Sequence, residues 1–297
     1  MPTTDPIETR VKKLEHAHQP KDTSRIPKTP QQFCETIQFD PDPWQLDLLN
    51  LIASDTPERI LANVCRQGGK TQTAAVCSVY HVLTGANRTV VIISPSMRQS
   101  QYMFRRIMQV YRAANRPIRA VSETALQLRL ENNSWIIGLP SSEDTVRGLT
   151  ASLLWVEEAS RCSDTLINAA LPFVATVPNA KICMMSTPAG QRGMWYTEWA
   201  KGVGYKKILV NADQCPRISR SFLDSQLEMM GPRYYAQEYY NSFESNEASI
   251  FRHEVIQKCI RDDLETLDDV LDAALDVDSE TEEADGVDID DLNFGNG

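Results

Sequence analysis

The stretch Val64-Cys65-Arg66-Gln67-Gly68-Gly69-Lys70-Thr71 lies between a short apolar segment, Ile60 to Val64, and a segment with helical spacing that ends near Leu83. A glycine-rich turn between a strand and a helix is the context of a phosphate-binding loop. Gly68 and Gly69 let backbone N–H groups turn toward anionic oxygens, and the positive end of the helix dipole adds to that attraction. We therefore predict that Lys70 reaches the β- and γ-phosphates of ATP and that the Thr71 hydroxyl binds Mg²⁺.

A pair of glutamates follows an apolar run in the segment Ser152-Leu153-Leu154-Trp155-Val156-Glu157-Glu158. Acidic side chains at the carboxyl end of a parallel strand lie where α/β sheets bind nucleotides. We predict that Glu157 holds Mg²⁺ through its water shell, because glutamate is one methylene longer than the usual aspartate. Glu158 is predicted to orient or deprotonate the attacking water. The alternative is a pair of exposed acids that open a helix.

The phosphate loop departs from the usual pattern at one position, because Val64 stands where the first glycine is normally found. The alternative interpretation is an ordinary strand, turn and helix that contains Gly-Lys-Thr by chance. The downstream glutamate pair argues against that alternative, since the two motifs together supply the parts of one ATP site.

Apolar segments with strand character alternate with helical segments along the chain. We predict strands at 60–64, 89–93, 126–130, 135–139, 153–156 and 182–185, and helices near 44–52, 71–83, 99–111, 222–230 and 234–240. Residues 131–134 read as the turn of a hairpin, and the β-branched run Thr89 to Ile93 indicates a strand buried on both faces. The alternation predicts an α/β fold: a P-loop NTPase with a central, mostly parallel β-sheet flanked by helices.

The expected organisation has four parts. Residues 1–30 form a flexible polar leader, 31–205 the ATPase core, 206–251 a small helical lid and linker broken at Gly231–Pro232, and 252–297 an acidic tail. Of the 40 acidic residues, 15 follow Arg261, where no Lys or Arg occurs, so the first 261 residues carry a net charge of +5 and the tail −15. A mildly basic body is compatible with nucleic-acid binding, and such a tail is expected to be solvated.

Other compositional features narrow the class of protein. Seven cysteines are scattered without a C-x-x-C pair, which favours reduced, mostly buried thiols over a zinc site or a disulfide framework. No apolar run approaches the ~20 residues of a membrane helix, and the polar N-terminus has no signal-like apolar region. We therefore expect an intracellular chain with no membrane partner.

The order and spacing of the motifs from about Phe39 to Phe251 resemble the ATPase domain of the large terminase subunit of tailed bacteriophages. The residues that carry this resemblance are Asp42-Pro43-Trp44-Gln45, Arg66 to Thr71, Thr89 to Ser96 with Arg98 and Gln99, Leu139-Pro140, Thr145 to Gly148, Met185 to Gly190 and Tyr235 to Tyr239. The resemblance implies a P-loop NTPase of the additional-strand, catalytic-glutamate type.

The resemblance also implies roles for individual residues. Gln45 would contact adenine, Arg66 would act in cis on the γ-phosphate side, and Arg147 would act in trans as an arginine finger. Ser186 and Thr187 would couple hydrolysis to movement. The alternatives are a helix-surface position for Gln45, a surface salt bridge for Arg147, and a strand end before Pro188 for the coupling pair.

The partners that the resemblance implies are double-stranded DNA, the capsid portal and the small terminase subunit, in the cytoplasm of a host cell. Subunits would form a homo-oligomeric ring, a pentamer, on the portal. The family's nuclease domain needs its own sheet to place carboxylates around two metal ions, and only 46 residues follow Phe251. We therefore expect no nuclease activity in this chain, which leaves room for a nuclease on a separate chain.

Two other functions remain as alternatives. A superfamily 2 helicase-like DNA-dependent ATPase shares the fold but needs a second ATPase-like domain. A nucleotide-binding protein without turnover is disfavoured by Glu158. The DNA contact is not identified by sequence: six arginines cluster along one predicted helix and its exit, and they are either phosphate ligands or ordinary solvated residues. They are Arg98, Arg105, Arg106, Arg112, Arg116 and Arg119.

Overall fold

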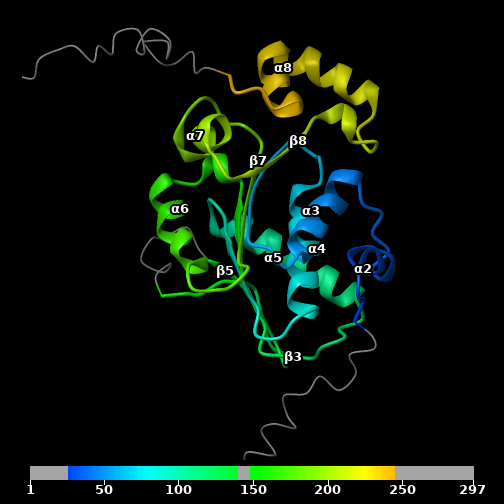
Figure 1. The fold of residues 1–297 in the computed structure, drawn as a ribbon. Helices are drawn as coiled ribbons and strands as arrows, with labels where there is room; N and C mark the ends of the chain where they lie inside the picture. Colours follow the sequence, from blue (N-terminus) through cyan, green and yellow to red (C-terminus); the bar gives the residue numbers. More distant parts are fainter. Residues whose placement is uncertain (1–25, 140–147, 245–297) are drawn as a thin grey trace, which may run out of the picture. The chain divides into compact units, whose positions relative to one another are not determined.

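The computed structural model describes residues 26–139 and 148–244, which build one eight-stranded sheet with helices on both faces (Figure 1). The strand order is β3-β4-β5-β2-β6-β7-β1-β8. The strands are β1 (Glu58–Val64), β2 (Thr89–Ile93), β3 (Ala120–Thr124), β4 (Gln127–Leu130), β5 (Trp135–Leu139), β6 (Leu153–Glu157), β7 (Lys181–Ser186) and β8 (Lys206–Val210).

The sheet is parallel from β5 to β8 and antiparallel at the β3-β4-β5 edge. Strand β7 lies between β1, which leads into the phosphate loop, and β6, which ends in the glutamates. That inserted strand is the feature expected of the additional-strand type. The predicted fold class, including the hairpin between β4 and β5, is confirmed.

Helices α2 (Pro30–Thr36), α3 (Pro43–Ala53), α4 (Lys70–Leu83) and α5 (Met97–Ala113) cover one face of the sheet, and α6 (Asp164–Ala170) and α7 (Gly193–Lys201) cover the other (Figure 1). Within the described ranges, short 3-10 turns connect some of these elements: η3 (Ala159–Arg161), η4 (Leu171–Val174) and η5 (Ala212–Gln214). No helix in the described ranges is long and apolar enough to cross a membrane.

Two hydrophobic cores, one on each face, follow from the two-residue period of the strands. Val90 and Ile92 of β2 belong to the core under α3, α4 and α5, whereas Val91 and Ile93 belong to the core under α6 and α7. The same alternation holds in β6, where Trp155 is fully buried on the α4 side. Strands buried on both faces fix the sheet as the rigid base from which the loops at its carboxyl edge project.

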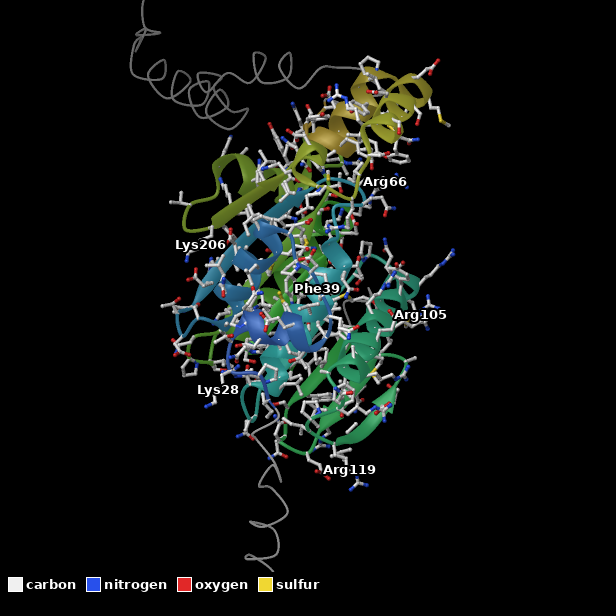
Figure 2. All side chains as sticks on the ribbon, turned by 90° about the vertical axis from the view of Figure 1, so that its right-hand side faces the viewer. Lys28, Phe39, Arg66, Arg105, Arg119 and Lys206 are labelled. Carbon is white, nitrogen blue, oxygen red and sulfur yellow. The ribbon has the colours of Figure 1, made fainter. Side chains whose placement is uncertain are left out.

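Helix α5 is amphipathic. Its buried positions include Met103, Phe104 and Ile107, while Arg98, Arg105 and Arg112 are exposed and Arg105 projects into solvent (Figure 2). The helix contains no acidic residue.

The boundary predicted at 205/206 is wrong in one respect, because 206–210 is not part of a lid. This segment is strand β8, which pairs in parallel with β1 at the edge of the core sheet. Two exposed lysines at its start hide the strand in the sequence. The helix in the region predicted as a lid is α8 (Arg220–Tyr240), and Gly231, with φ of 77°, breaks it at the predicted position.

Candidate functional site

The phosphate loop connects β1 to α4 through a tight turn. Gly69, the residue before α4, has φ of 99°, a left-handed conformation that glycine adopts without steric cost. A side chain at Gly68 would meet the Val64 side chain at 2.7 Å. Val64, at the position of the usual first glycine, is a fully buried strand residue whose side chain packs against Gly68.

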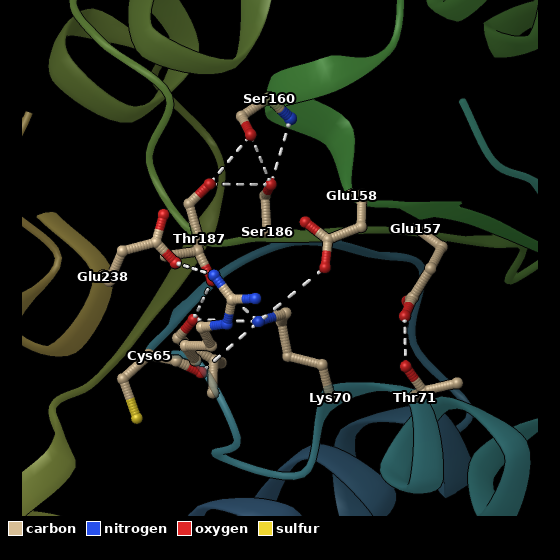
Figure 3. A network of polar contacts seen from close by, with 11 residues as sticks. Cys65, Lys70, Thr71, Glu157, Glu158, Ser160, Ser186, Thr187 and Glu238 are labelled. Carbon is tan, nitrogen blue, oxygen red and sulfur yellow. Dashed lines mark hydrogen bonds and ion pairs between the residues drawn. The ribbon is translucent and has the colours of Figure 1, made fainter. Parts of the chain in front are cut away.

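Lys70 is buried and makes three hydrogen bonds within the protein. Its Nζ donates to the carbonyl oxygens of Val64 and Cys65, both at 3.3 Å, and to the Thr187 hydroxyl at 2.7 Å. Figure 3 shows it at the centre of the polar network, with Glu158 Oε1 at 3.9 Å. The lysine therefore connects the phosphate loop, β6 and β7.

Glu157 lies at the end of β6, is 4% exposed, and accepts a hydrogen bond from the Thr71 hydroxyl at 2.8 Å. Burial, and next the charge of Glu158, raise the pKa of Glu157 from 4.5 to about 7. Its other oxygen, Oε2, has no hydrogen-bond partner among the described residues. A buried carboxylate with an unpaired oxygen beside a threonine hydroxyl is a donor set that suits Mg²⁺, so these two residues fit the predicted metal role.

Glu158 follows β6 in a left-handed conformation, with φ of 51° and ψ of 48°. Such a conformation is unfavourable for a residue with a side chain, and strained positions of this kind concentrate at functional sites. It turns the carboxylate toward Lys70, where the side chain is 24% exposed (Figure 3). The two neighbouring glutamates therefore occupy different environments: one is buried against Thr71 and the other faces the open cavity.

Ser186 and Thr187, the predicted coupling pair at the end of β7, contact both motifs. The Thr187 hydroxyl accepts from Lys70 and donates to the Val64 carbonyl at 2.9 Å. The Ser186 hydroxyl lies 2.7 Å from the Ser160 hydroxyl and accepts from the Ser160 backbone N–H. Ser160, just after the glutamates, was not identified from the sequence, because a serine in a short turn carries no pattern of its own. Ser186 and Thr187 therefore join the phosphate loop to the turn after β6.

Arg66 links the loop to α8. Its backbone N–H donates to the Glu238 carbonyl at 2.7 Å, and its Nη1 lies 3.3 Å from the Glu238 carboxylate. The Arg66 side chain remains 61% exposed. The predicted γ-phosphate residue is thus held at the edge of the site by helix α8.

Gln45 is 2% exposed, which excludes the helix-surface alternative. Its Oε1 accepts from the Asp42 backbone N–H at 2.9 Å, and its Nε2 donates to the Thr73 hydroxyl at 2.7 Å. An amide has two donor hydrogens and two acceptor lone pairs, so one of each has no partner among the described residues.

A cavity of about 900 Å³ lies beside the phosphate loop, within the range of ligand sites. Its lining includes Gln45, Arg66, Gln67, Gly69, Lys70, Thr71, Glu158 and Thr187 among the predicted residues, and Phe39, Tyr102, Arg106, Arg161, Arg217 and Glu238 among those that sequence reasoning did not assign to the ATP site. The buried Glu157 is not one of its lining residues. Arg147 lies outside the described residues, so its predicted role is not tested.

Comparison with solved structures shows which known fold this architecture matches. The ATPase domain of the Thermus phage P74-26 large terminase superposes with a TM-score of 0.61 over 72% of this chain and 98% of that domain, at 20% sequence identity. The fold is that of a large terminase ATPase domain.

Two longer proteins are also similar. The bacteriophage HK97 large terminase matches 70% of this chain with a TM-score of 0.57 at 15% identity. The large terminase of a thermophilic bacteriophage, solved in complex with ADP, matches 68% with the same TM-score and identity. This chain spans about half the length of these two proteins, 51% and 53%. No protein-family model matches the sequence, and no curated protein is detectably similar to it.

Proposed function

We propose that this chain is an ATP-hydrolysing motor subunit of a viral terminase, which translocates double-stranded DNA into a procapsid. The observation that carries the proposal is that Lys70, Thr71, Glu158 and Thr187 line one cavity of about 900 Å³. The buried Glu157 accepts a hydrogen bond from Thr71 beside it. A phosphate-binding loop beside a buried carboxylate and a partly exposed one contains the parts that ATP hydrolysis needs.

Each residue has a role in this proposal. Backbone N–H groups near Gly69 and the Lys70 ammonium bind the phosphates, and Gln45 contacts adenine with its free amide groups. Thr71 and Glu157 hold Mg²⁺, which when bound neutralises charge on the phosphate oxygens. Glu158, exposed to the cavity, orients the attacking water and accepts its proton. Arg66, on the exposed edge of the loop, stabilises negative charge on the γ-phosphate side.

Thr187 is the residue that couples ATP hydrolysis to movement in this proposal. Its hydroxyl contacts both the Lys70 ammonium and the Val64 carbonyl, so a change in what Lys70 binds alters the hydrogen bonds at the end of β7. Ser186 passes the change to Ser160, in the turn after the catalytic glutamate. The contacts join strands β1, β6 and β7 at their carboxyl ends.

The exposed face of α5 is the proposed DNA contact. Arg98, Arg105 and Arg112 recur every seven residues, which places them on one line along the helix at intervals of about 10 Å. Because α5 has no acidic residue, this line presents positive charge without compensation on its own helix. Cations spaced along a helix suit the phosphate backbone of a duplex.

The assembly follows the resemblance to terminases. We propose a homo-oligomeric ring, a pentamer, on the capsid portal in the host cytoplasm, with the small terminase subunit as a partner and Arg147 acting on the ATP of the neighbouring subunit. The proposal does not assign nuclease activity to this chain, and a separately encoded nuclease would supply DNA cleavage.

ATP hydrolysis should be measured with and without double-stranded DNA, together with strand separation. A motor of this kind hydrolyses ATP, is stimulated by duplex DNA and separates no strands. Strand separation would favour the helicase alternative, and nucleotide binding without turnover would favour a regulatory protein.

The DNA contact has its own test. The triple variant Arg98→Gln, Arg105→Gln, Arg112→Gln should keep DNA-independent ATPase activity, lose DNA stimulation and lower the salt dependence of DNA binding by about 0.9 per lost phosphate contact. Arg129→Gln, an exposed arginine on β4, is the matched control. An unchanged salt dependence in the triple variant would exclude this face.

A further inference from the structure

A second cluster lies on the opposite side of the phosphate loop from the glutamates. Arg217 follows β8 in the connection to α8, and its guanidinium forms a two-pronged ion pair with Asp42: Nη1 donates to Oδ1 at 2.7 Å and Nη2 to Oδ2 at 2.6 Å. Asp42 is buried, whereas the Arg217 side chain is 48% exposed and lines the nucleotide cavity. The pair therefore fixes the plane of the guanidinium and leaves part of it open to the cavity.

The position of Arg217 relative to the loop is defined by Gly69. A Cβ atom added to Gly69 would lie 2.6 Å from Nε2 of Gln45 and 3.3 Å from Nη2 of Arg217. The amide and the guanidinium therefore lie side by side over the same glycine. Cys215, buried in the core two residues earlier, and the partly buried Ile218 anchor this segment.

The sheet order shows which end of a nucleotide reaches Arg217. The strands run β6-β7-β1-β8, so Glu158 after β6 and Arg217 after β8 project from strands three spacings apart, about 14 Å, with the phosphate loop after β1 between them. If the γ-phosphate lies near Glu158, the chain of phosphates leads across the loop and the base lies on the β8 side. Arg217 and Gln45 are the groups found there.

We propose that Arg217 is a base-binding residue of this site, with its guanidinium stacked on one face of the adenine while Gln45 bonds to the edge of the ring. The inference rests on the proposed function. An arginine whose hydrogen-bonding edge is already occupied by a carboxylate is a weak ligand for phosphate, but its flat face still packs on an aromatic ring. This arrangement of a planar cation beside an amide matches a purine. The cation stacks on the face of the ring, and the amide donor and acceptor bond to an acceptor and a donor on the edge of the ring.

The test compares nucleotides with a ligand that has no base. ATPase kinetics give KM and kcat for ATP, and inorganic tripolyphosphate, used as a competitive inhibitor, reports on the phosphate part of the site alone. Arg217→Ala should raise KM for ATP about ten-fold, the effect of losing one stacked base, with kcat and tripolyphosphate inhibition unchanged. Arg217→Lys, which keeps the charge but not the plane, should not restore KM.

Two further variants keep the outcome interpretable. Arg217→Ala alone leaves buried Asp42 without its partner, which can impair folding, so the double variant Asp42→Asn, Arg217→Ala removes both charges and should show the same rise in KM. Arg220→Ala is the control and should leave KM unchanged, because Arg220 is an exposed arginine at the start of α8 that pairs with Asp224.

Three results would overturn the inference. Weaker tripolyphosphate inhibition in parallel with KM would make Arg217 a phosphate ligand, as would rescue by lysine. Unchanged KM in both Arg217→Ala and the double variant would mean that the ion pair of Asp42 and Arg217 only holds α3 and the segment after β8 together. Wild-type protein that neither binds nor hydrolyses ATP would instead reject the proposed function, so the two failures are distinguishable.

Discussion

Replacement of Glu157 by glutamine should stabilise the folded protein, and more so as the pH rises. The carboxyl is buried, so its pKa is about 7 in the folded protein against an ordinary value of 4.5. Each pH unit between these values is worth about 1.4 kcal/mol, so the ionised side chain costs the folded state about 3 kcal/mol above pH 7. Glutamine mimics the protonated form and can still accept the hydrogen bond from Thr71.

The sign follows from linkage. Because the pKa is higher in the folded than in the unfolded chain, this carboxyl contributes stability at low pH and loses that contribution as the pH rises to about 7. The free-energy advantage of Glu157→Gln over wild type should therefore grow from below about 1 kcal/mol at pH 5 to about 3 kcal/mol at pH 8.

The assay is urea unfolding at pH 5, 6, 7 and 8, at constant ionic strength and without nucleotide or Mg²⁺. Glu35→Gln, at an exposed position on α2, controls for the loss of one negative charge. A second measurement adds Mg²⁺ and ATP, which should raise the melting temperature of wild type far more than that of Glu157→Gln. A difference in stability that does not change with pH would refute the reasoning about burial.

Further outcomes follow from the site. Lys70→Ala should abolish ATP hydrolysis, and near-normal turnover by the folded variant would remove the loop from the mechanism. Glu158→Gln should still bind ATP but hydrolyse it at least ~100-fold more slowly; if Glu157→Gln were far slower at saturating ATP, the two roles would be reversed. If Arg147 acts in trans, a mixture of Glu158→Gln subunits and Arg147→Ala subunits should recover ATPase activity under conditions where wild-type subunits assemble. The recovery should be large, because arginine fingers are worth roughly 10³–10⁵ in rate. A mixture as inactive as its components would place Arg147 in cis or in a structural role. The purified chain should not nick plasmid DNA with Mg²⁺ or Mn²⁺, and nicking that disappears when acidic residues after Arg261 are changed would contradict this.

The parts of the site that sequence predicts are those with a local signal. A glycine pair before Lys70 and an apolar run before Glu157 each combine a motif with an element, and both motifs fall at the carboxyl ends of parallel strands as expected. The core strands were predictable for the same reason, because burial on both faces leaves a continuous apolar run.

Other parts depend on contacts between distant segments, which no local pattern reveals. Arg217 meets Asp42 across 175 positions, and Arg66 meets Glu238 across 172. The sequence pattern favours a lid over a strand at 206–210, because an edge strand with exposed lysines lacks the apolar signature of a buried one. The contact of Arg217 can be recognised only in the folded chain, where the sheet order brings the end of β8 next to the loop after β1.

Hydrogen-bond acceptors within the protein compete with the substrate phosphate for the Lys70 ammonium. Two loop carbonyls and the Thr187 hydroxyl already satisfy the three N–H groups of the ammonium, so a phosphate must displace some of them. The affinity for the phosphate therefore reflects the difference between the contacts that Lys70 makes with the phosphate and those that it makes within the protein. The same internal acceptors favour product release, because they bind the lysine again when the phosphate leaves. A smaller acceptor set, as in Thr187→Val, would tighten nucleotide binding and slow product release, so that a single hydroxyl adjusts how long each nucleotide stays.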